Sequence, residues 1–107
     1  TFVSDIVDGI LGALDYTDRV GAPKCDIFNL GGSQTVKLNE MIAAIESALG
    51  KKAVINEMPE QPGDVPLTSA YVTKATKLLN FKPTTHLDTG IPKFVEWWLE
   101  MRKLGLR

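Results

Sequence analysis

The sequence predicts a small α/β domain of about four helices with two or three short strands. Four stretches carry apolar residues at helical spacing, and two shorter apolar stretches, Cys25–Leu30 and Ala53–Met58, are typical of strands. Segments with glycine or proline separate these stretches. With 107 residues, 44% of them hydrophobic, the chain can bury a modest core, so we expect residues 1–107 to form one domain.

The first helix is predicted from Ser4 to about Asp15, with Ile6, Val7, Ile10, Leu11 and Leu14 at helical spacing. Ser4 is a favourable N-cap residue, and acidic residues in the first turns suit the helix dipole. Residues Thr17–Lys24 contain Gly21 and Pro23, which predicts an exposed loop.

The first strand, Cys25–Leu30, is predicted to end at Gly31 and Gly32, whose lack of a side chain permits a positive φ. Asn29, near the end of this strand, has an amide that can bind a ligand. The alternative, that the amide only satisfies backbone groups of the loop, is equally open.

The second helix is predicted from Lys37 or Leu38 to Leu49, with Gly50 just beyond its end. The second strand, Ala53–Met58, then leads into a polar loop. If both strands end near one another, Asn29 and that loop lie at one edge, where α/β folds gather their ligand sites.

Residues Gln61–Pro66 form that loop, with two prolines and one glycine in six residues, so the sequence predicts a fixed turn. Gly63 allows close backbone approach, Asp64 can accept hydrogen bonds from hydroxyls, and Gln61 offers a donor and an acceptor. The turn is therefore a candidate clamp for a sugar or nucleotide. An ordinary surface turn is the alternative.

Two further helices are predicted after this loop. The first spans Val72–Leu79 and stops around Asn80. In the second, Pro92 favours an N-cap at Thr89 over Thr85, because proline costs no hydrogen bond only within the first turn. An apolar stripe follows along this helix, made of Ile91, Phe94, Val95 and Trp98.

Composition argues against several kinds of partner. Twelve basic and thirteen acidic residues give a formal net charge of −1 without a basic run, so nucleic acid is not an expected partner. No apolar run approaches the roughly 20 residues of a membrane span. Cys25 has no second cysteine for a disulfide, and neither it nor the lone His86 has a cluster that would hold a metal. We therefore expect a cytoplasmic protein with no metal site.

The sequence also lacks a recognisable catalytic centre. It has no glycine-rich phosphate loop after a strand, no Tyr-x-x-x-Lys pair and no Ser/His/Asp set. His86 has no placed partner that would make it a general base. The chain also begins at a helix without an initiator methionine, so we expect it to be a piece of a larger protein.

Five segments resemble, in order and with similar spacing, the C-terminal portion of NAD-dependent nucleotide-sugar epimerases and dehydratases. These segments are Thr1–Ile10, Ile27–Gly32, Leu49–Lys52, Gln61–Pro66 and Gly90–Trp97. The enzymes are extended short-chain dehydrogenases/reductases, and the sequence is most similar to UDP-glucuronate 4-epimerases. The resemblance covers essentially the whole chain.

The resemblance implies a division of labour. In such enzymes an N-terminal Rossmann domain binds NAD and carries the catalytic Tyr and Lys, while the C-terminal domain binds the nucleotide diphosphate of the sugar. Residues 1–107 match only that C-terminal nucleotide-sugar-binding domain. NAD is then a cofactor of the parent enzyme, this chain binds none and carries no catalytic residue, and its partners are a UDP-sugar and the missing Rossmann domain.

The resemblance also assigns substrate-binding roles. Asn29 matches an asparagine near the diphosphate, and Asp64 matches an acidic residue close to the ribose. Gln61 stands where many relatives have a phosphate-binding arginine, and a neutral amide cannot make the same bidentate charged contact. Ser69 and Tyr71 also depart from the family's Tyr-Ala-Asp run, which leaves the exact substrate open.

Three functions follow as hypotheses. The first is the substrate-binding lobe of a UDP-glucuronate 4-epimerase-like enzyme, inactive in isolation. The second is the equivalent lobe of a nucleotide-sugar dehydratase. The third is a free-standing interaction module that self-associates, for example as a homodimer, through an apolar helix face and the Trp97/Trp98 region.

Overall fold

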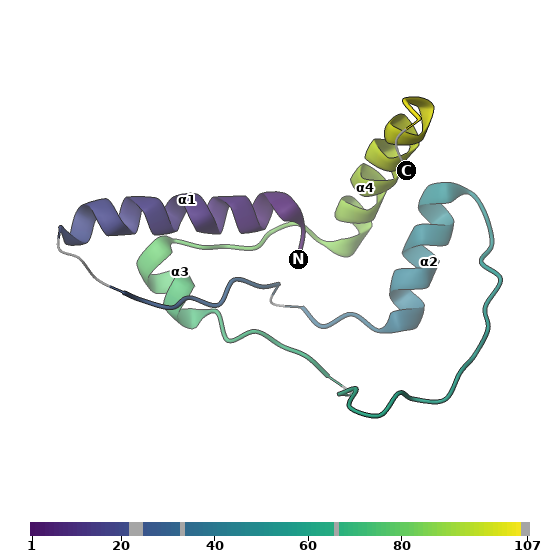
Figure 1. Ribbon diagram of the computed structural model, residues 1–107, viewed down its shortest axis with the longest axis horizontal. Helices are drawn as coiled ribbons and strands as arrows, with labels where there is room; N and C mark the ends of the chain where they lie inside the picture. The colour runs from purple at the N-terminus through teal and green to yellow at the C-terminus, as the bar shows by residue number, and fades with distance from the viewer. Residues whose placement is uncertain (22–24, 33, 66, 106–107) are drawn as a thin grey trace. The chain divides into compact units, whose positions relative to one another are not determined.

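The computed structural model describes residues 1–21, 25–32, 34–65 and 67–105. The chain divides into two compact units (Figure 1). The first unit comprises Thr1–Thr35 and Leu67–Thr85, and the second comprises Val36–Pro66 and His86–Arg107. Four helices are described, α1 and α3 in the first unit and α2 and α4 in the second.

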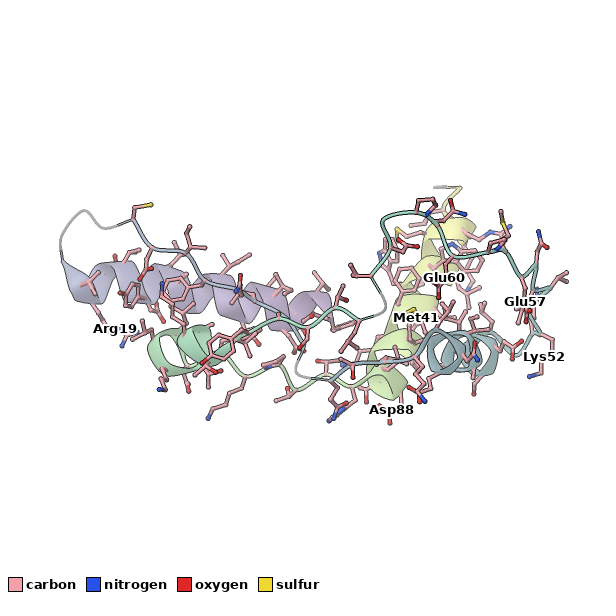
Figure 2. All side chains as sticks on the ribbon, turned by 90° about the horizontal axis from the view of Figure 1, so that it is seen from below. Arg19, Met41, Lys52, Glu57, Glu60 and Asp88 are labelled. Atoms are coloured by element: carbon pink, nitrogen blue, oxygen red, sulfur yellow. The ribbon has the colours of Figure 1, made fainter. Side chains whose placement is uncertain are left out.

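Helix α1 spans Val3–Val20 and is longer at its C-terminal end than the sequence predicts. The expected loop from Thr17 is wrong for its first residues, because Gly21 takes the left-handed conformation with φ 61° and its N–H bonds to the Thr17 carbonyl at 3.4 Å. A left-handed glycine directly after the last helical residue is the most common way in which α-helices end. Arg19 also anchors the last turn by donating to the Leu78 carbonyl at 2.8 Å, reaching from α1 toward α3 (Figure 2).

The start of α1 also differs from the prediction. Its N-cap position is Phe2, and no side chain caps the helix there, so Ser4 is not the N-cap. The nearby Asp5 carboxylate does not cap the helix either, because it accepts hydrogen bonds from the Thr85 N–H at 3.1 Å and the Thr85 hydroxyl at 2.9 Å. Residues Pro23 and Lys24 of the predicted loop lie outside the described residues.

Helix α3 spans Thr73–Leu79, within one residue of the prediction, and Asn80 ends it with a φ of 56°. It packs against α1. Between them lies the core of the first unit, made of buried residues and partly buried apolar neighbours: Tyr16, Ala75, Leu79 and Phe81, with Ala13, Phe28, Leu30 and Val72. The Tyr16 and Phe28 rings meet edge to face, with centroids 5.4 Å apart.

Glycines set how closely the elements of the first unit approach. A Cβ on Gly12 of α1 would lie 2.6 Å from the Leu79 carbonyl oxygen, and one on Gly31 would lie 2.6 Å from Ala70 Cβ. Gly31 and Gly32 do not use the positive φ that their lack of a side chain permits, since neither is among the glycines with positive φ. At Gly31 the absent side chain serves packing instead.

The two predicted strands are not observed, and the described residues contain no β-strand. The fold-class prediction is therefore correct for the four helices and wrong for the strands. A strand is defined by hydrogen bonds to a neighbour, and neither Cys25–Leu30 nor Ala53–Met58 has such a ladder. Both segments are non-helical, as their sequences predict, but neither forms a β-ladder with another described residue.

In the second unit, α2 spans Leu38–Leu49 and α4 spans Leu87–Lys103, and the two helices pack against each other. The limits of α2 match the prediction, and Gly50 ends it with a φ of 63°. Gly90 and Val95 are the buried residues of α4. Phe94 and Trp97 of the same helix are 53% and 52% exposed, so much of the aromatic surface of this unit faces solvent.

The start of α4 differs from both predicted N-caps, Thr85 and Thr89. The N-cap position is His86, whose carbonyl accepts hydrogen bonds from the N–H groups of Thr89 at 3.1 Å and Gly90 at 2.8 Å. Pro92 therefore lies inside the helix, beyond the first turn. The Asp88 carbonyl loses the helical bond that an N–H at position 92 would have made.

Candidate functional site

The turn at Gln61–Asp64 is formed as the sequence predicts. The Asp64 N–H donates to the Gln61 carbonyl at 3.1 Å, and Gly63 has a φ of 96°. Proline at the second position and a positive-φ glycine at the third are the signature of a type II β-turn. The predicted loop residue Pro66 lies outside the described residues.

Gly63 is required in this turn by its backbone conformation. A side chain there is strained because of the positive φ, although the space around the position is open, with no heavy atom within 4 Å of an added Cβ. Gln61, Gly63 and Asp64 are all exposed. The turn thus presents an amide and a carboxylate on a fixed backbone, with free space over the glycine.

Glu46 anchors the extended segment that leads from α2 to this turn. Its carboxylate accepts hydrogen bonds from Lys52 Nζ at 2.7 Å and from the Ala53 N–H at 2.8 Å. The Lys52 hydrogen bond, followed by the Ala53 N–H, lowers the pKa of the Glu46 carboxyl below its ordinary value. Beyond this anchor the residues up to Val65 are exposed, Glu57 and Glu60 among them (Figure 2).

Asn29 lies in the first unit, in the extended segment after α1, and it is exposed. Lys74 of α3 holds the preceding residues: its ammonium contacts the Asp26 carboxylate, donates to the Ile27 carbonyl at 2.8 Å and lies 4.6 Å from the centre of the Phe28 ring. Sequence patterns carry no sign of this anchor, because Lys74 and Asp26 are 48 residues apart.

The predicted site residues therefore fall into two groups. Gln61, Gly63 and Asp64 share one turn of the second unit, whereas Asn29 belongs to the first unit. Their common participation in a site remains a prediction. Of the positions that depart from the family pattern, Tyr71 is 75% exposed and Ser69 is also exposed.

An open groove that the sequence did not predict runs along α1 and the end of α3. None of the predicted site residues lines it; its lining residues are Asp8, Leu11, Gly12, Asp15, Asp18, Arg19, Leu79 and Asn80. The three aspartates oppose the binding of an anion, and the one arginine already donates to the Leu78 carbonyl. This groove does not suit a nucleotide diphosphate.

The described residues offer neither a metal site nor a membrane span. No group of three or more His, Cys, Asp or Glu residues there could hold a metal ion. No helix formed by those residues is long and apolar enough to cross a membrane. His86 occupies the N-cap position of α4, and Cys25 is an exposed free thiol.

Comparison with known proteins identifies relatives along the whole chain. An uncharacterized protein of Methanocaldococcus jannaschii, MJ1055, is 42% identical over 111 aligned residues, which cover 100% of this chain and 31% of that protein. UDP-glucuronate 4-epimerase 2 of Arabidopsis thaliana is 38% identical, over 98% of this chain and 26% of its own length. No protein-family model matches the chain.

A solved structure is similar as well. The UDP-glucuronic acid 4-epimerase of Bacillus cereus, crystallised with UDP-4-deoxy-4-fluoro-glucuronic acid and NAD, matches with a TM-score of 0.77 and 26% identity. The match covers 94% of this chain and 31% of that protein. The chain thus spans less than a third of the length of these relatives, and it is similar to a segment of UDP-glucuronate 4-epimerases.

Proposed function

We propose that this chain is the nucleotide-sugar-binding part of a longer NAD-dependent epimerase that acts on UDP-glucuronate or a closely related UDP-sugar. Similarity to UDP-glucuronate 4-epimerases over nearly the whole chain carries the proposal. The dehydratase and the free-standing module are not favoured by these relatives. The exposed free thiol of Cys25 is compatible with the cytoplasm, where we place the protein.

The turn at Gln61–Asp64 supplies the proposed contacts to the nucleotide. The Asp64 carboxylate accepts hydrogen bonds from ribose hydroxyls, and the Gln61 amide donates to the diphosphate without a full charge. The open space over Gly63 lets the ligand come close to the backbone. Asn29 adds an amide near the diphosphate. In this proposal all four residues bind and orient the substrate, Gly63 through its backbone and the others through their side chains. None of the four transfers a proton.

NAD belongs, in this proposal, to the rest of the longer protein. When bound, it supplies the hydride chemistry of epimerisation. The residues of this chain do not fit an NAD site of the usual kind, since no glycine-rich phosphate loop follows an extended segment in its sequence. The catalytic Tyr and Lys are likewise expected in the N-terminal Rossmann domain.

Calorimetric titration of the full-length protein with UDP-glucuronate tests the proposal. We expect Asp64→Ala to weaken binding about tenfold or more, because a hydrogen bond to a charged group is worth about 1.5–3 kcal/mol and about 1.4 kcal/mol is a factor of ten. Glu60→Ala is the matched control, since Glu60 is an exposed acidic residue in the same segment.

Each result has a defined meaning. Unchanged binding by a folded Asp64→Ala protein would show that the turn is structural. Equal losses in Asp64→Ala and Glu60→Ala would indicate a general effect of negative charge rather than a ribose contact. Failure of the unaltered full-length protein to bind any UDP-sugar would refute the proposed function itself.

A further inference from the structure

We propose that Lys74 is a positioning residue for substrate binding, which fixes the place of Asn29 without touching the ligand. The inference rests on the proposed function, in which the Asn29 amide binds near the diphosphate of a UDP-sugar. Lys74 lies on α3 and Asn29 lies in the extended segment after α1, so tertiary contacts must connect them.

The extended segment around Asn29 has two faces. From Cys25 to Leu30 every second residue is exposed, and the residues between them are half-buried. Asn29 belongs to the exposed face, whereas Phe28 and Leu30 of the half-buried face pack against the core of the first unit. Successive side chains of an extended chain lie on opposite sides, so the contacts that hold the half-buried face also decide where the Asn29 amide lies.

Lys74 holds the segment from its half-buried face. The ammonium forms an ion pair with the Asp26 carboxylate and lies 4.6 Å from the centre of the Phe28 ring, and both of these side chains belong to that face. It also donates to the Ile27 carbonyl at 2.8 Å. The three residues directly before Asn29 therefore contact one ammonium group. Because hydrogen bonds weaken steeply when their geometry is poor, these contacts restrict how far the segment can shift.

The base of the Lys74 side chain is itself held firmly. Ala75, the next residue of α3, has an exposed fraction of 0%. On the other side of Asn29, Gly31 lies so close to Ala70 that an added Cβ would be 2.6 Å from the Ala70 Cβ. The start of α3 and the residues just before it thus contact the segment both before and after Asn29.

A direct contact between Lys74 and a phosphate is the alternative role for this lysine. Two observations oppose it: Lys74 contacts the face opposite to Asn29, and its charge is paired with Asp26. A phosphate beside Asn29 would therefore meet the amide rather than the ammonium. The two roles predict opposite effects of Asp26→Asn, because removal of the carboxylate would leave the lysine charge available to a phosphate.

Calorimetric titration of the full-length protein with UDP-glucuronate tests the role of Lys74. We expect Lys74→Met, which keeps an apolar side chain of similar length and removes the charge, to weaken binding about fivefold to tenfold, and no more than Asn29→Ala does. Lys74→Arg keeps a cationic donor and should restore most of the affinity. Lys77→Met is the matched control, because Lys77 is an exposed lysine of the same helix, and it should bind like the unaltered protein.

A double-mutant cycle separates positioning from a general structural effect. If Lys74 acts through Asn29, Lys74→Met should change the affinity by less than about twofold once Asn29 is replaced by alanine. Losses that multiply in the double variant would overturn the proposal, because Lys74 would then act independently of Asn29.

Asp26→Asn checks the proposal without removing the lysine, and it decides the question if Lys74→Met does not fold. Weaker binding of UDP-glucuronate is the expected result, because the amide holds the ammonium less strongly than the carboxylate does. Tighter binding would overturn the proposal in favour of a direct phosphate contact.

Amide hydrogen exchange of the full-length protein gives a readout without ligand. We expect amides within residues 27–31 to exchange at least about tenfold faster in Lys74→Met than in Lys77→Met, because local opening becomes easier when the ammonium contacts are lost. Equal exchange in the two variants would overturn the proposal, since the segment would then be held without Lys74.

The affinity of the unaltered full-length protein keeps the two proposals apart. If it binds no UDP-sugar, the proposed function is refuted, and the role of Lys74 in it is refuted as well. If it binds UDP-glucuronate and the losses of Lys74→Met and Asn29→Ala multiply, only the role of Lys74 is refuted.

Discussion

The Asp5 side chain, near the start of the chain, holds Thr85 in place through hydrogen bonds. It is only 5% exposed and accepts two hydrogen bonds from Thr85, one from the backbone and one from the hydroxyl. From the sequence alone, Asp5 is expected to interact favourably with the dipole of the first helix, and Thr85 is a candidate N-cap of the last helix. The partnership spans 80 residues, so no local pattern could reveal it.

The first prediction concerns this pair. Asp5→Ala should lower the free energy of unfolding by about 2–4 kcal/mol, because it removes a charged acceptor and leaves partly buried donors unsatisfied. Urea unfolding of the 107-residue chain measures the change. Asp8→Ala is the control, since Asp8 is an exposed aspartate of the same helix. Equal stability of the two variants would show that the Asp5 contact contributes nothing.

Gly12 gives a second prediction at the scale of single residues. In an exposed helix, Gly→Ala is favourable by about 1 kcal/mol. Here the new Cβ would lie 2.6 Å from the backbone carbonyl oxygen of Leu79, which cannot rotate away. We therefore expect Gly12→Ala to destabilise the chain by about 1–3 kcal/mol, as overpacking does. A stabilised Gly12→Ala variant in thermal unfolding would contradict the close packing of α1 on α3.

At the scale of elements, the Glu46 anchor joins the end of α2 to the segment that leads to the Gln61–Asp64 turn. Because Lys52 and the Ala53 N–H lower the pKa of Glu46 in the folded state, the anchor stabilises the fold above the unfolded-state pKa of this carboxyl. The stabilisation is lost as the pH falls through the lower, folded-state pKa.

NMR titration of the glutamate side chains measures this prediction. The pKa of Glu46 should lie below its ordinary value, and Lys52→Ala should raise it toward that value, because the Lys52 hydrogen bond is the largest cause of the shift. A pKa of Glu46 that does not respond to Lys52→Ala would show that Lys52 does not hold the anchor.

The elements also differ in how well the sequence predicts them. Helix α2 matches because its signals are local: an apolar stripe, a Glu40 carboxylate that accepts from the Lys37 N–H at 3.1 Å, and Gly50 at its end. The segment Cys25–Leu30 has the alternation of a strand, but strand pairing depends on contacts that are distant in the sequence, and no β-ladder forms among the described residues. The Gln61–Asp64 turn was predictable because proline and glycine dictate its backbone, whereas its distance from Asn29 depends on the whole fold.

For the whole molecule, we predict that the purified 107-residue chain shows no epimerase turnover when NAD and UDP-glucuronate are supplied. Hydride transfer needs a bound nicotinamide and a base within hydrogen-bond reach, and this sequence offers neither a dinucleotide-binding loop nor a Tyr-x-x-x-Lys pair. A coupled assay for the product sugar measures this, with the full-length protein as the positive control. Turnover that persists after repeated purification of the 107-residue chain would refute the proposed division of labour.

The aromatic residues give each unit its own optical signature. Both tryptophans, Trp97 and Trp98, lie in the second unit, whereas both tyrosines, Tyr16 and Tyr71, lie in the first. The Arg102 guanidinium also lies 4.9 Å from the centre of the Trp98 ring. Tryptophan fluorescence therefore follows the unfolding of α2 and α4, and the near-ultraviolet signal of Tyr16 follows that of α1 and α3. Coincident melting of the two signals would mean that the units unfold cooperatively, and separate transitions would mean that each melts alone.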